Sequence, residues 1–410
     1  MSPQAFTHNY VSASYSQIAC IGTGLSAIAL GATLKRWYDM DDIHFFERHA
    51  DCGGTWHISS YPGCACDVPS ALYSFSFALS SRWTKLMPSY KEIKSYHDEV
   101  VEDYGLRGRM TFNTEVEECF WCEDISRWTM KLRNVVTGEV THHECQILFA
   151  ATGQLVEPKP CDIPGSETFK GCIFHSARWD HNVDLDGKNV IVIGNGCTAA
   201  QIVPAIVNQA AAELRLKRRQ KVEKYMRETA PAKYHDTLIP DFDVGCKRRI
   251  FNGGYLESLH NEKLFLEETK ITEITPDGIR TTDKFYPADV IVLATGFQTN
   301  KFLPYTEIHG LEGTISDHWA RYDGPGAYNC SAMSGFPNFF LLLGPNAATG
   351  HTSALMAAEN SVNYALRVLK PVLDGKAASI NLKQEAEDAY VHRVQEALLH
   401  MVWNAGCASV

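Results

Sequence analysis

The sequence predicts an α/β protein with two dinucleotide-binding, Rossmann-like domains. Three observations predict this fold class: a glycine-rich turn joins an apolar strand to a helix near residue 22, the same pattern recurs near residue 194, and each unit contains a later apolar strand that ends in Ala-Thr-Gly. A repeated nucleotide-binding unit implies two bound nucleotides. We expect one to be a flavin and the other a nicotinamide, because electrons must pass between two carriers.

The first unit contains a Gly-x-Gly-x-x-Ala motif between strands. An apolar segment at 16–21 leads into Gly22, Gly24 and Ala27, and a second strand at 43–46 ends in Glu47. The glycines allow the backbone to approach a pyrophosphate at a helix N-terminus, and an acid at position 47 can accept the ribose hydroxyls of FAD. The alternative is an ordinary tight turn, which is disfavoured because strand, helix and acid are all in register.

The second unit differs from the first where the ribose is recognised. Arg218 stands 24 positions after the first glycine of the repeated motif, and a basic residue there accommodates a 2′-phosphate. The second site is therefore predicted to bind NADPH, although the basic run around Arg218 also suits a solvated helix face. The residues predicted to bind NADPH in this unit are Gly194, Gly196, Thr198, Ala199 and Arg218.

The order of segments predicts that the second domain is inserted into the first. Residues 158–164 resemble a linker, and an apolar strand at 339–343, a Gly-Pro-Asn turn and a helix at 353–373 suggest a return to the first domain. The predicted domains are an FAD-binding domain at 1–165, a shortened NADPH-binding domain at 166–298, and the returning FAD-binding segment at 299–410.

Composition excludes several protein classes. The chain has 410 residues and a net charge of −10, which argues against nucleic acid as a bulk partner. No apolar run approaches the roughly 20 residues that span a bilayer, and we see no secretory signal. The 13 scattered cysteines are an odd number, which suits reduced thiols. We therefore expect a soluble, cytoplasmic protein whose oligomeric state stays open.

Three further motifs narrow the chemistry. Gly-Gly-Thr-Trp at 53–56 follows the first acid, and a Tyr-Pro-Gly segment at 61–67 comes soon after. Residues 169–180 read Phe-Lys-Gly-Cys-Ile-Phe-His-Ser-Ala-Arg-Trp-Asp and lie just before the second glycine motif. They match every fixed position of Phe-x-Gly-x-x-x-His-x-x-x-Trp-Pro/Asp, the signature of the type I Baeyer–Villiger monooxygenases. The chain closely resembles this family of class B flavoprotein monooxygenases over nearly its whole length.

The resemblance implies a flavin-dependent oxygenation. In the family, NADPH reduces FAD, oxygen adds to flavin C4a, and the resulting peroxide attacks a ketone to give an ester or lactone. We expect a small-molecule ketone and O2 as substrates, in secondary metabolism. The signature histidine, His175, is implied to act in an interdomain hinge, outside the chemistry.

The resemblance also assigns site residues. Arg248 matches the arginine that stabilises the oxyanion, with Arg249 as the neighbouring alternative, and Asp67 matches the aspartate that orients it. Lys247 matches a lysine that contacts the 2′-phosphate of NADPH. The further cofactor contacts that we expect are Gly54, Thr55, Trp56, Asp67 and Asn346.

Two alternative functions stay open. The first is the sister reaction, oxygenation of a nitrogen or sulfur atom, for which no arginine is needed. The second is an FAD protein that has lost NADPH-driven activity and is redox-neutral or inactive. Its basis is that about thirty residues separate Arg218 from Arg248, fewer than in relatives, and that the segment 400–410 matches a family segment that continues further.

Cysteine and histidine clusters have structural interpretations. Cys119 and Cys122 form a Cys-x-x-Cys pair that suggests a disulfide reductase, but acidic neighbours would raise the thiol pKa, so we favour structural cysteines. His142, His143 and Cys145 lack convincing zinc spacing, and we expect no metal.

Overall fold

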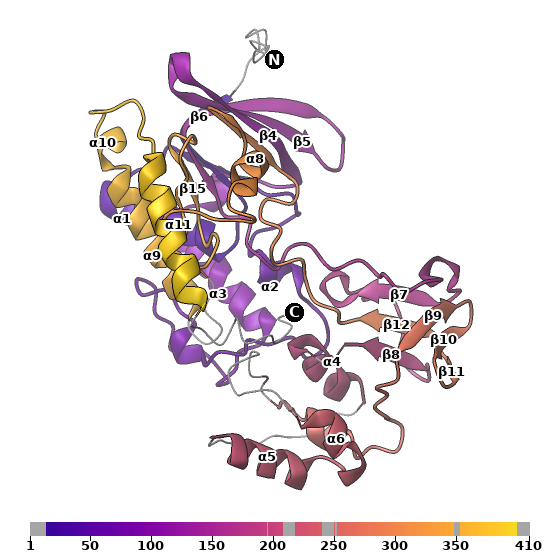
Figure 1. Cartoon of the computed structure of the whole chain (residues 1–410). Coiled ribbons are helices and arrows are strands. Elements are labelled where there is room, and N and C mark those ends of the chain that lie inside the picture. The colour runs from indigo at the N-terminus through magenta and orange to yellow at the C-terminus, as the bar shows by residue number, and fades with distance from the viewer. Residues whose placement is uncertain are drawn as a thin grey trace.

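The computed structural model describes residues 14–194, 196–207, 218–239, 250, 252–347 and 353–399. Figure 1 shows a larger part that carries β1–β6 and the C-terminal helices, and a smaller part at its side that carries β7–β12. Among the described residues, no helix combines the length and the apolarity that crossing a membrane requires.

The larger part is organised around a nine-stranded mixed sheet. Its strand order is β14-β13-β4-β5-β6-β1-β2-β3, with β15 pairing β6. Strand β1 runs parallel to β2 and β6, whereas β5 is antiparallel to β4 and β6. The strands are β1 Ser14–Ile21, β2 Ile43–Phe46, β3 Met110–Thr111, β4 Thr114–Cys122, β5 Arg127–Asn134, β6 Val140–Ala150, β13 Glu307–Gly310, β14 Gly313–Thr314 and β15 Phe339–Leu341.

Helices cover both faces of this sheet. Apolar side chains of α1, α3 and α9 form one core with β1 and β6, including Ile28, Ile147 and Leu355. A second core on the other face contains Trp128 and Phe339. The helices are α1 Leu25–Tyr38, α2 Thr55–Ile58, α3 Tyr90–Asp103, α8 Ile315–Ala320, α9 Ala354–Val368, α10 Lys370–Leu373 and α11 Gln384–Leu399.

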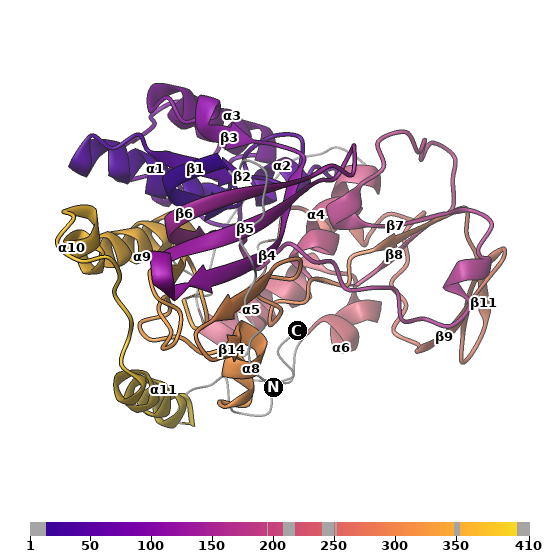
Figure 2. The same cartoon turned by 90° about the horizontal axis from the view of Figure 1, so that it is seen from above.

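The smaller part repeats the parallel arrangement on a reduced scale. A parallel sheet has the order β7-β12-β8, and a separate antiparallel sheet has the order β11-β10-β9. Figure 2 shows α4 between the two parts. The elements are β7 Cys172–His175, β8 Val190–Ile193, α4 Cys197–Val207, α5 Arg218–Thr229, α6 His235–Leu238, α7 Tyr255–Ser258, β9 Ile271–Thr275, β10 Gly278–Thr281, β11 Phe285–Pro287 and β12 Val290–Leu293.

Short 3-10 helices occupy the connections between these elements. They are η1 Ser70–Leu72, η2 Arg107–Arg109, η3 Glu123–Ile125, η4 Ser166–Thr168, η5 Ser176–Arg178 and η6 Ala232–Tyr234.

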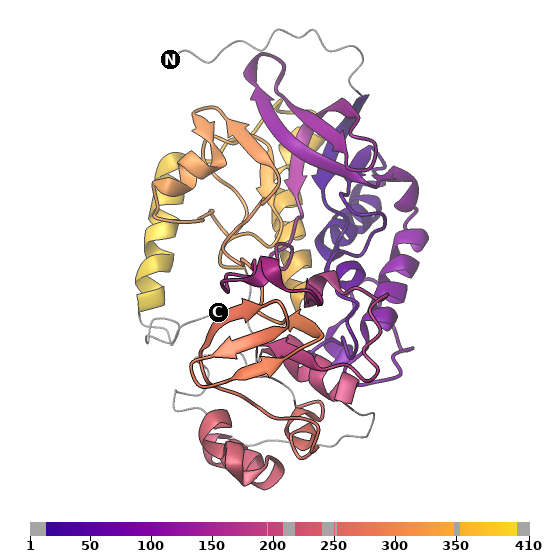
Figure 3. The ribbon, with the colours of Figure 1, turned by 90° about the vertical axis from the view of Figure 1, so that its right-hand side faces the viewer.

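Two chain segments connect the parts and run side by side. The amide of Lys159 donates to the carbonyl of Gly296 (3.0 Å), and that of Gln298 donates to the carbonyl of Glu157 (3.0 Å). Figure 3 shows the return segment, in orange and yellow, beside the N-terminal half of the larger part. Strand β15 reaches this position because it pairs with β6.

The predicted α/β fold class is confirmed, and the strands expected at 16–21, at 43–46 and before the second glycine turn are present. Two boundaries were wrong. The helix expected over 353–373 is divided at Leu369, because Pro371 lacks the amide hydrogen that a continuous helix requires. The strand expected to reach 343 ends at Leu341, since Leu343 takes a left-handed φ of 57°. The domain boundaries stay predictions.

Candidate functional site

The first glycine turn forms a backbone cradle at the end of β1. Gly22 has a φ of 98°, and a Cβ atom there would lie 2.7 Å from the carbonyl oxygen of Ala151, so only glycine fits. Gly24 is the N-cap of α1, and no side chain caps this helix end. The first turn of α1 also lacks an acidic residue, so its free N–H groups and its dipole favour an anion.

A second loop closes the cradle from the other side. The amide of Gly53 donates to the carbonyl of Thr23 (3.1 Å), and a Cβ atom on Gly54 would lie 3.0 Å from the Cα of Gly24. Gly53 and Gly54 both have positive φ values, 113° and 56°. The predicted contacts Gly54, Thr55 and Trp56 therefore lie at the same turn as Gly22 and Gly24. This side-chain-free space suits a pyrophosphate.

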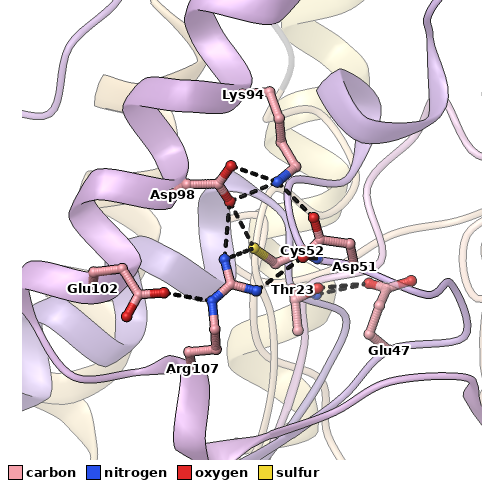
Figure 4. Close-up of polar contacts among 8 residues, drawn as sticks. All are labelled: Thr23, Glu47, Asp51, Cys52, Lys94, Asp98, Glu102 and Arg107. Atoms are coloured by element: carbon pink, nitrogen blue, oxygen red, sulfur yellow. Dashed lines mark hydrogen bonds and ion pairs between the residues drawn. The ribbon is translucent and has the colours of Figure 1, made fainter.

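Glu47 lies at the end of β2 with its carboxylate buried beside the turn (Figure 4). Thr23 donates to Oε2 from its amide (3.0 Å) and its hydroxyl (2.9 Å), and His49 donates to Oε1 from its amide (2.9 Å) and Nδ1 (2.7 Å). Burial opposes ionisation, but the hydrogen bonds from His49 and Thr23 outweigh it and lower the pKa of Glu47. An ionised carboxylate results, and the Thr23 hydroxyl and His49 ring are rotatable donors that ribose hydroxyls could replace.

Sequence reasoning missed Thr23 and His49 as partners of the acid. Their positions could have indicated this role, because Thr23 lies between the two glycines and His49 lies two positions after Glu47. Ala27, which was predicted, is fully buried on α1, where a small side chain permits close packing of helix and strand.

The second glycine turn has the same construction. Gly194 has a φ of 123°, and a Cβ atom there would lie 2.4 Å from the carbonyl oxygen of Ala294. Gly196 has open space around it, and Thr198 and Ala199 lie in the first turn of α4. The hydroxyl of Thr295 is buried without a partner among the described residues. This turn therefore fits a second nucleotide.

The Tyr-Pro-Gly segment connects the two units. The Tyr61 hydroxyl donates to Oε1 of Gln201 on α4 (2.8 Å), and Nε2 of Gln201 donates to the carbonyl of Ala65 (3.0 Å). A cavity of about 610 Å³ lies along Tyr61–Ala65 and reaches His181, a volume that suits a small molecule. Asp67, two residues beyond Ala65, is partly buried.

The roles of the other predicted residues stay predictions. Lys247 and Arg248 lie outside the described residues. Arg218 is the first residue of helix α5, and its side chain lies outside the described set, so its role stays a prediction. Asn346 is exposed in the turn after β15 with a φ of 64°.

His175 of the signature motif, the last residue of β7, contacts the second of the two connecting segments. Its Nε2 donates to the carbonyl of Gly296 (3.1 Å), and its Nδ1 accepts the amide of Ala177 (3.1 Å). Its ring also meets Phe297 edge-on at 5.6 Å. Burial lowers the pKa of His175, so the ring is neutral and acts as one donor and one acceptor. This position suits a hinge, which stays a prediction.

The cysteine and histidine clusters have partners that suit structural roles. Cys119 is buried in β4, and burial, Cys145 and Glu118 raise the pKa of its thiol. His143 contacts the hydroxyls of Ser14 (2.8 Å) and Ser16 (2.9 Å). The 11 cysteines in the described part of the chain form no disulfide bond.

Comparison with known proteins identifies the family. A profile described as FMO-like, flavin-binding monooxygenase-like, matches residues 15–222. A Baeyer–Villiger monooxygenase of Streptomyces coelicolor is 32% identical over 455 aligned positions, which cover 96% of this chain and 86% of that protein. One from Pseudomonas aeruginosa is 30% identical and covers 96% of this chain and 84% of that protein. The crystal structure of OTEMO in complex with FAD and NADP has a TM-score of 0.86 and 25% identity, over 97% of this chain and 92% of that chain.

The cofactors of a similar structure agree with the two nucleotide-binding turns described above. The ligands of the OTEMO structure are FAD and NADP, which are the predicted cofactors. The alignment with the S. coelicolor enzyme has 455 positions, more than the 410 residues of this chain, so that relative contains segments that this chain lacks. The chain belongs to the flavin-binding monooxygenase-like family and, within it, to the Baeyer–Villiger monooxygenases.

Proposed function

We propose that this chain is an FAD-dependent, NADPH-using monooxygenase that converts a ketone to an ester or a lactone. In this reaction NADPH, a proton, O2 and the ketone give NADP+, water and the oxygenated product. This proposal rests mainly on the two glycine turns at Gly22 and Gly194, each of which packs against the backbone carbonyl that directly follows a neighbouring parallel strand. The complete signature motif lies between the two turns in the sequence. The proposal extends to a role in secondary metabolism. It also extends to a cytoplasmic location, because reduced thiols are typical of that compartment.

The first turn would hold FAD. The N-terminus of α1 and the backbone of Gly22–Gly24 would bind the pyrophosphate, and Glu47 would accept the ribose hydroxyls. The cofactor, when bound and reduced, supplies the oxygen-activating chemistry. The second turn, with Thr198 in the first turn of α4, would hold NADPH in the same way. Arg218 and Lys247 would neutralise the 2′-phosphate.

Two residues would assist the attack on the ketone. Negative charge develops on the ketone oxygen during attack, and a permanently charged guanidinium stabilises it in a water-poor cavity. We assign this role to Arg248 and the orientation of its side chain to Asp67, on the resemblance to the family. The attachment of the Tyr61–Ala65 segment to α4 supports the assignment of Asp67, because it holds that chain segment against the helix that follows the second glycine turn.

Anaerobic mixing with NADPH tests the cofactor half of the proposal. Purified protein should contain FAD, and the flavin should lose its yellow colour in a stopped-flow experiment. A flavin that stays oxidised would refute NADPH use and favour the alternative of a redox-neutral FAD protein.

Replacement of Arg248 tests the ketone half. An Arg248→Ala variant should retain FAD and its reduction by NADPH but lose ester formation, whereas oxygenation of a thioether could persist because it needs no arginine. If wild-type protein oxygenates sulfur or nitrogen and no ketone, the sister reaction replaces the one proposed here.

A further inference from the structure

A charged cluster stands behind the loop that closes the first glycine turn (Figure 4). Asp51 precedes the loop, whereas Lys94 and Asp98 lie one turn apart on α3 and Arg107 follows that helix. Lys94 Nζ lies 2.8 Å from Asp51 Oδ2 and 2.6 Å from Asp98 Oδ1. Arg107 lies 3.0 Å from Asp51 and 3.1 Å from Asp98. Arg107 also pairs with Glu102 (2.5 Å), so two cations and three carboxylates form one connected network.

This cluster does not have the chemistry of a metal site. Asp51, Cys52 and Asp98 are the one group of metal-ligand types that lies close together in the described part of the chain. Their carboxylates are already neutralised by Lys94 and Arg107, and the Cys52 thiol donates to Asp98 (3.4 Å). Burial raises the pKa of Cys52 to about 12, which disfavours the thiolate that a metal requires.

Lys94 also touches the loop with the carbon atoms of its side chain. A Cβ atom on Gly53 would lie 2.8 Å from Cδ and 3.2 Å from Cε of Lys94, so the stem covers the face that glycine leaves open. The Lys94 side chain is only 17% exposed. Burial opposes its charge, but the hydrogen bonds to Asp51 and Asp98 outweigh burial and raise the pKa of Lys94.

The loop needs such support because its own conformation is weakly determined. Gly53 and Gly54 both have positive φ values and no side chains, so the unfolded loop has many conformations to lose. The Gly53 amide bonds the Thr23 carbonyl on the cradle side, and Asp51 is anchored to α3 on the other side. The loop is therefore held between the cradle and Lys94.

We propose that the Lys94–Asp51 ion pair is a positioning element that fixes the Gly53–Gly54 loop against the Gly22–Gly24 turn and thereby sets the affinity for the pyrophosphate of FAD. This proposal rests on the FAD site of the proposed function. Lys94 does not itself touch the cofactor in this account, since it acts through the loop.

The test compares FAD with FMN, which lacks the AMP half of FAD and therefore its second phosphate. Apoprotein is titrated with FAD and with FMN, and binding is followed by quenching of flavin fluorescence. Lys94→Met should weaken FAD binding by about tenfold or more, because a charge-assisted bond is lost, and should change FMN binding by less than about threefold. Lys94→Arg should restore most of the affinity for FAD. Lys370→Met is the control, because Lys370 forms an ion pair of the same length with Asp374 at the end of α10 (2.8 Å) but is more exposed and lies away from the glycine loop in the sequence.

A second variant covers poor folding of the first. Asp51→Asn keeps the size of the side chain and an acceptor for the Cys52 amide, but removes the charge that pairs with Lys94. It should show the same selective loss of FAD, and adding Lys94→Met to it should weaken FAD binding by no more than about twofold further.

The outcomes separate this proposal from the proposed function. Wild-type protein that binds no FAD would refute the FAD site itself. If wild-type protein binds FAD and Lys94→Met matches Lys370→Met, the positioning role is refuted. Equal weakening of FAD and FMN would also refute it, because Lys94 would then support the fold in general.

Discussion

Replacing Gly24 by alanine separates the cofactor role of the first turn from its role in folding. Gly24 has a φ of −76°, which any residue adopts, and a Cβ atom there would lie 3.6 Å from the nearest atom, the Cα of Gly54. The protein alone therefore accommodates alanine, at a cost of about 1 kcal/mol for the poorer N-cap. The added methyl group would occupy the cradle between Gly24 and Gly54, where the pyrophosphate of FAD is proposed to lie.

We expect Gly24→Ala apoprotein to unfold within a few degrees of wild type and to bind FAD about 100-fold more weakly. Gly22→Ala should behave differently, because its Cβ would meet a backbone carbonyl at 2.7 Å with a φ of 98°, so the fold itself should suffer. Gly108→Ala is the control, since no atom lies within 4 Å of its Cβ position. Thermal unfolding and FAD titration measure both effects. Normal FAD affinity in Gly24→Ala would refute the placement of the pyrophosphate.

Three further predictions follow from the buried polar groups. Burial lowers the pKa of His97 from 6.5 to about 4, so the unfolded chain binds a proton at this histidine at a higher pH than the folded chain does. The free energy of unfolding should therefore fall by about 3 kcal/mol as the pH drops from about 6.5 to about 4. His97→Phe should reduce this loss in thermal unfolding, and an unchanged pH profile would contradict the prediction. Glu47→Gln should weaken FAD binding about tenfold in titrations, because the ionised acceptor proposed for the ribose hydroxyls is lost. Equal affinity would count against the ribose role. His175→Ala should slow flavin reduction by NADPH while FAD affinity stays within about twofold of wild type, and a matching loss of FAD would contradict a hinge.

Local patterns made the two nucleotide turns predictable from the sequence. Gly22 and Glu47 belong to one short unit in which strand, turn and helix follow one another, so their spacing alone places them together. The return of the chain to the first sheet was also readable, because the apolar run at β15 has the composition of a buried parallel strand.

Contacts between distant segments could not be predicted in this way. Lys94 and Asp51 are 43 positions apart, and nothing in either segment indicates that α3 packs behind the glycine loop. The same holds for Gln201, which meets Tyr61 across 140 positions. Pro371 was a readable signal that was overlooked, since proline disfavours continuation of a helix.

The central claim is that this chain couples NADPH oxidation to oxygen insertion into a ketone. The most direct measurement supplies NADPH, a panel of ketones and isotopically labelled dioxygen to the FAD-loaded protein and analyses the products by mass spectrometry. We predict an ester or lactone that carries one labelled oxygen atom for each NADPH consumed. NADPH consumption that yields only hydrogen peroxide, or no consumption by FAD-loaded protein, would contradict the account.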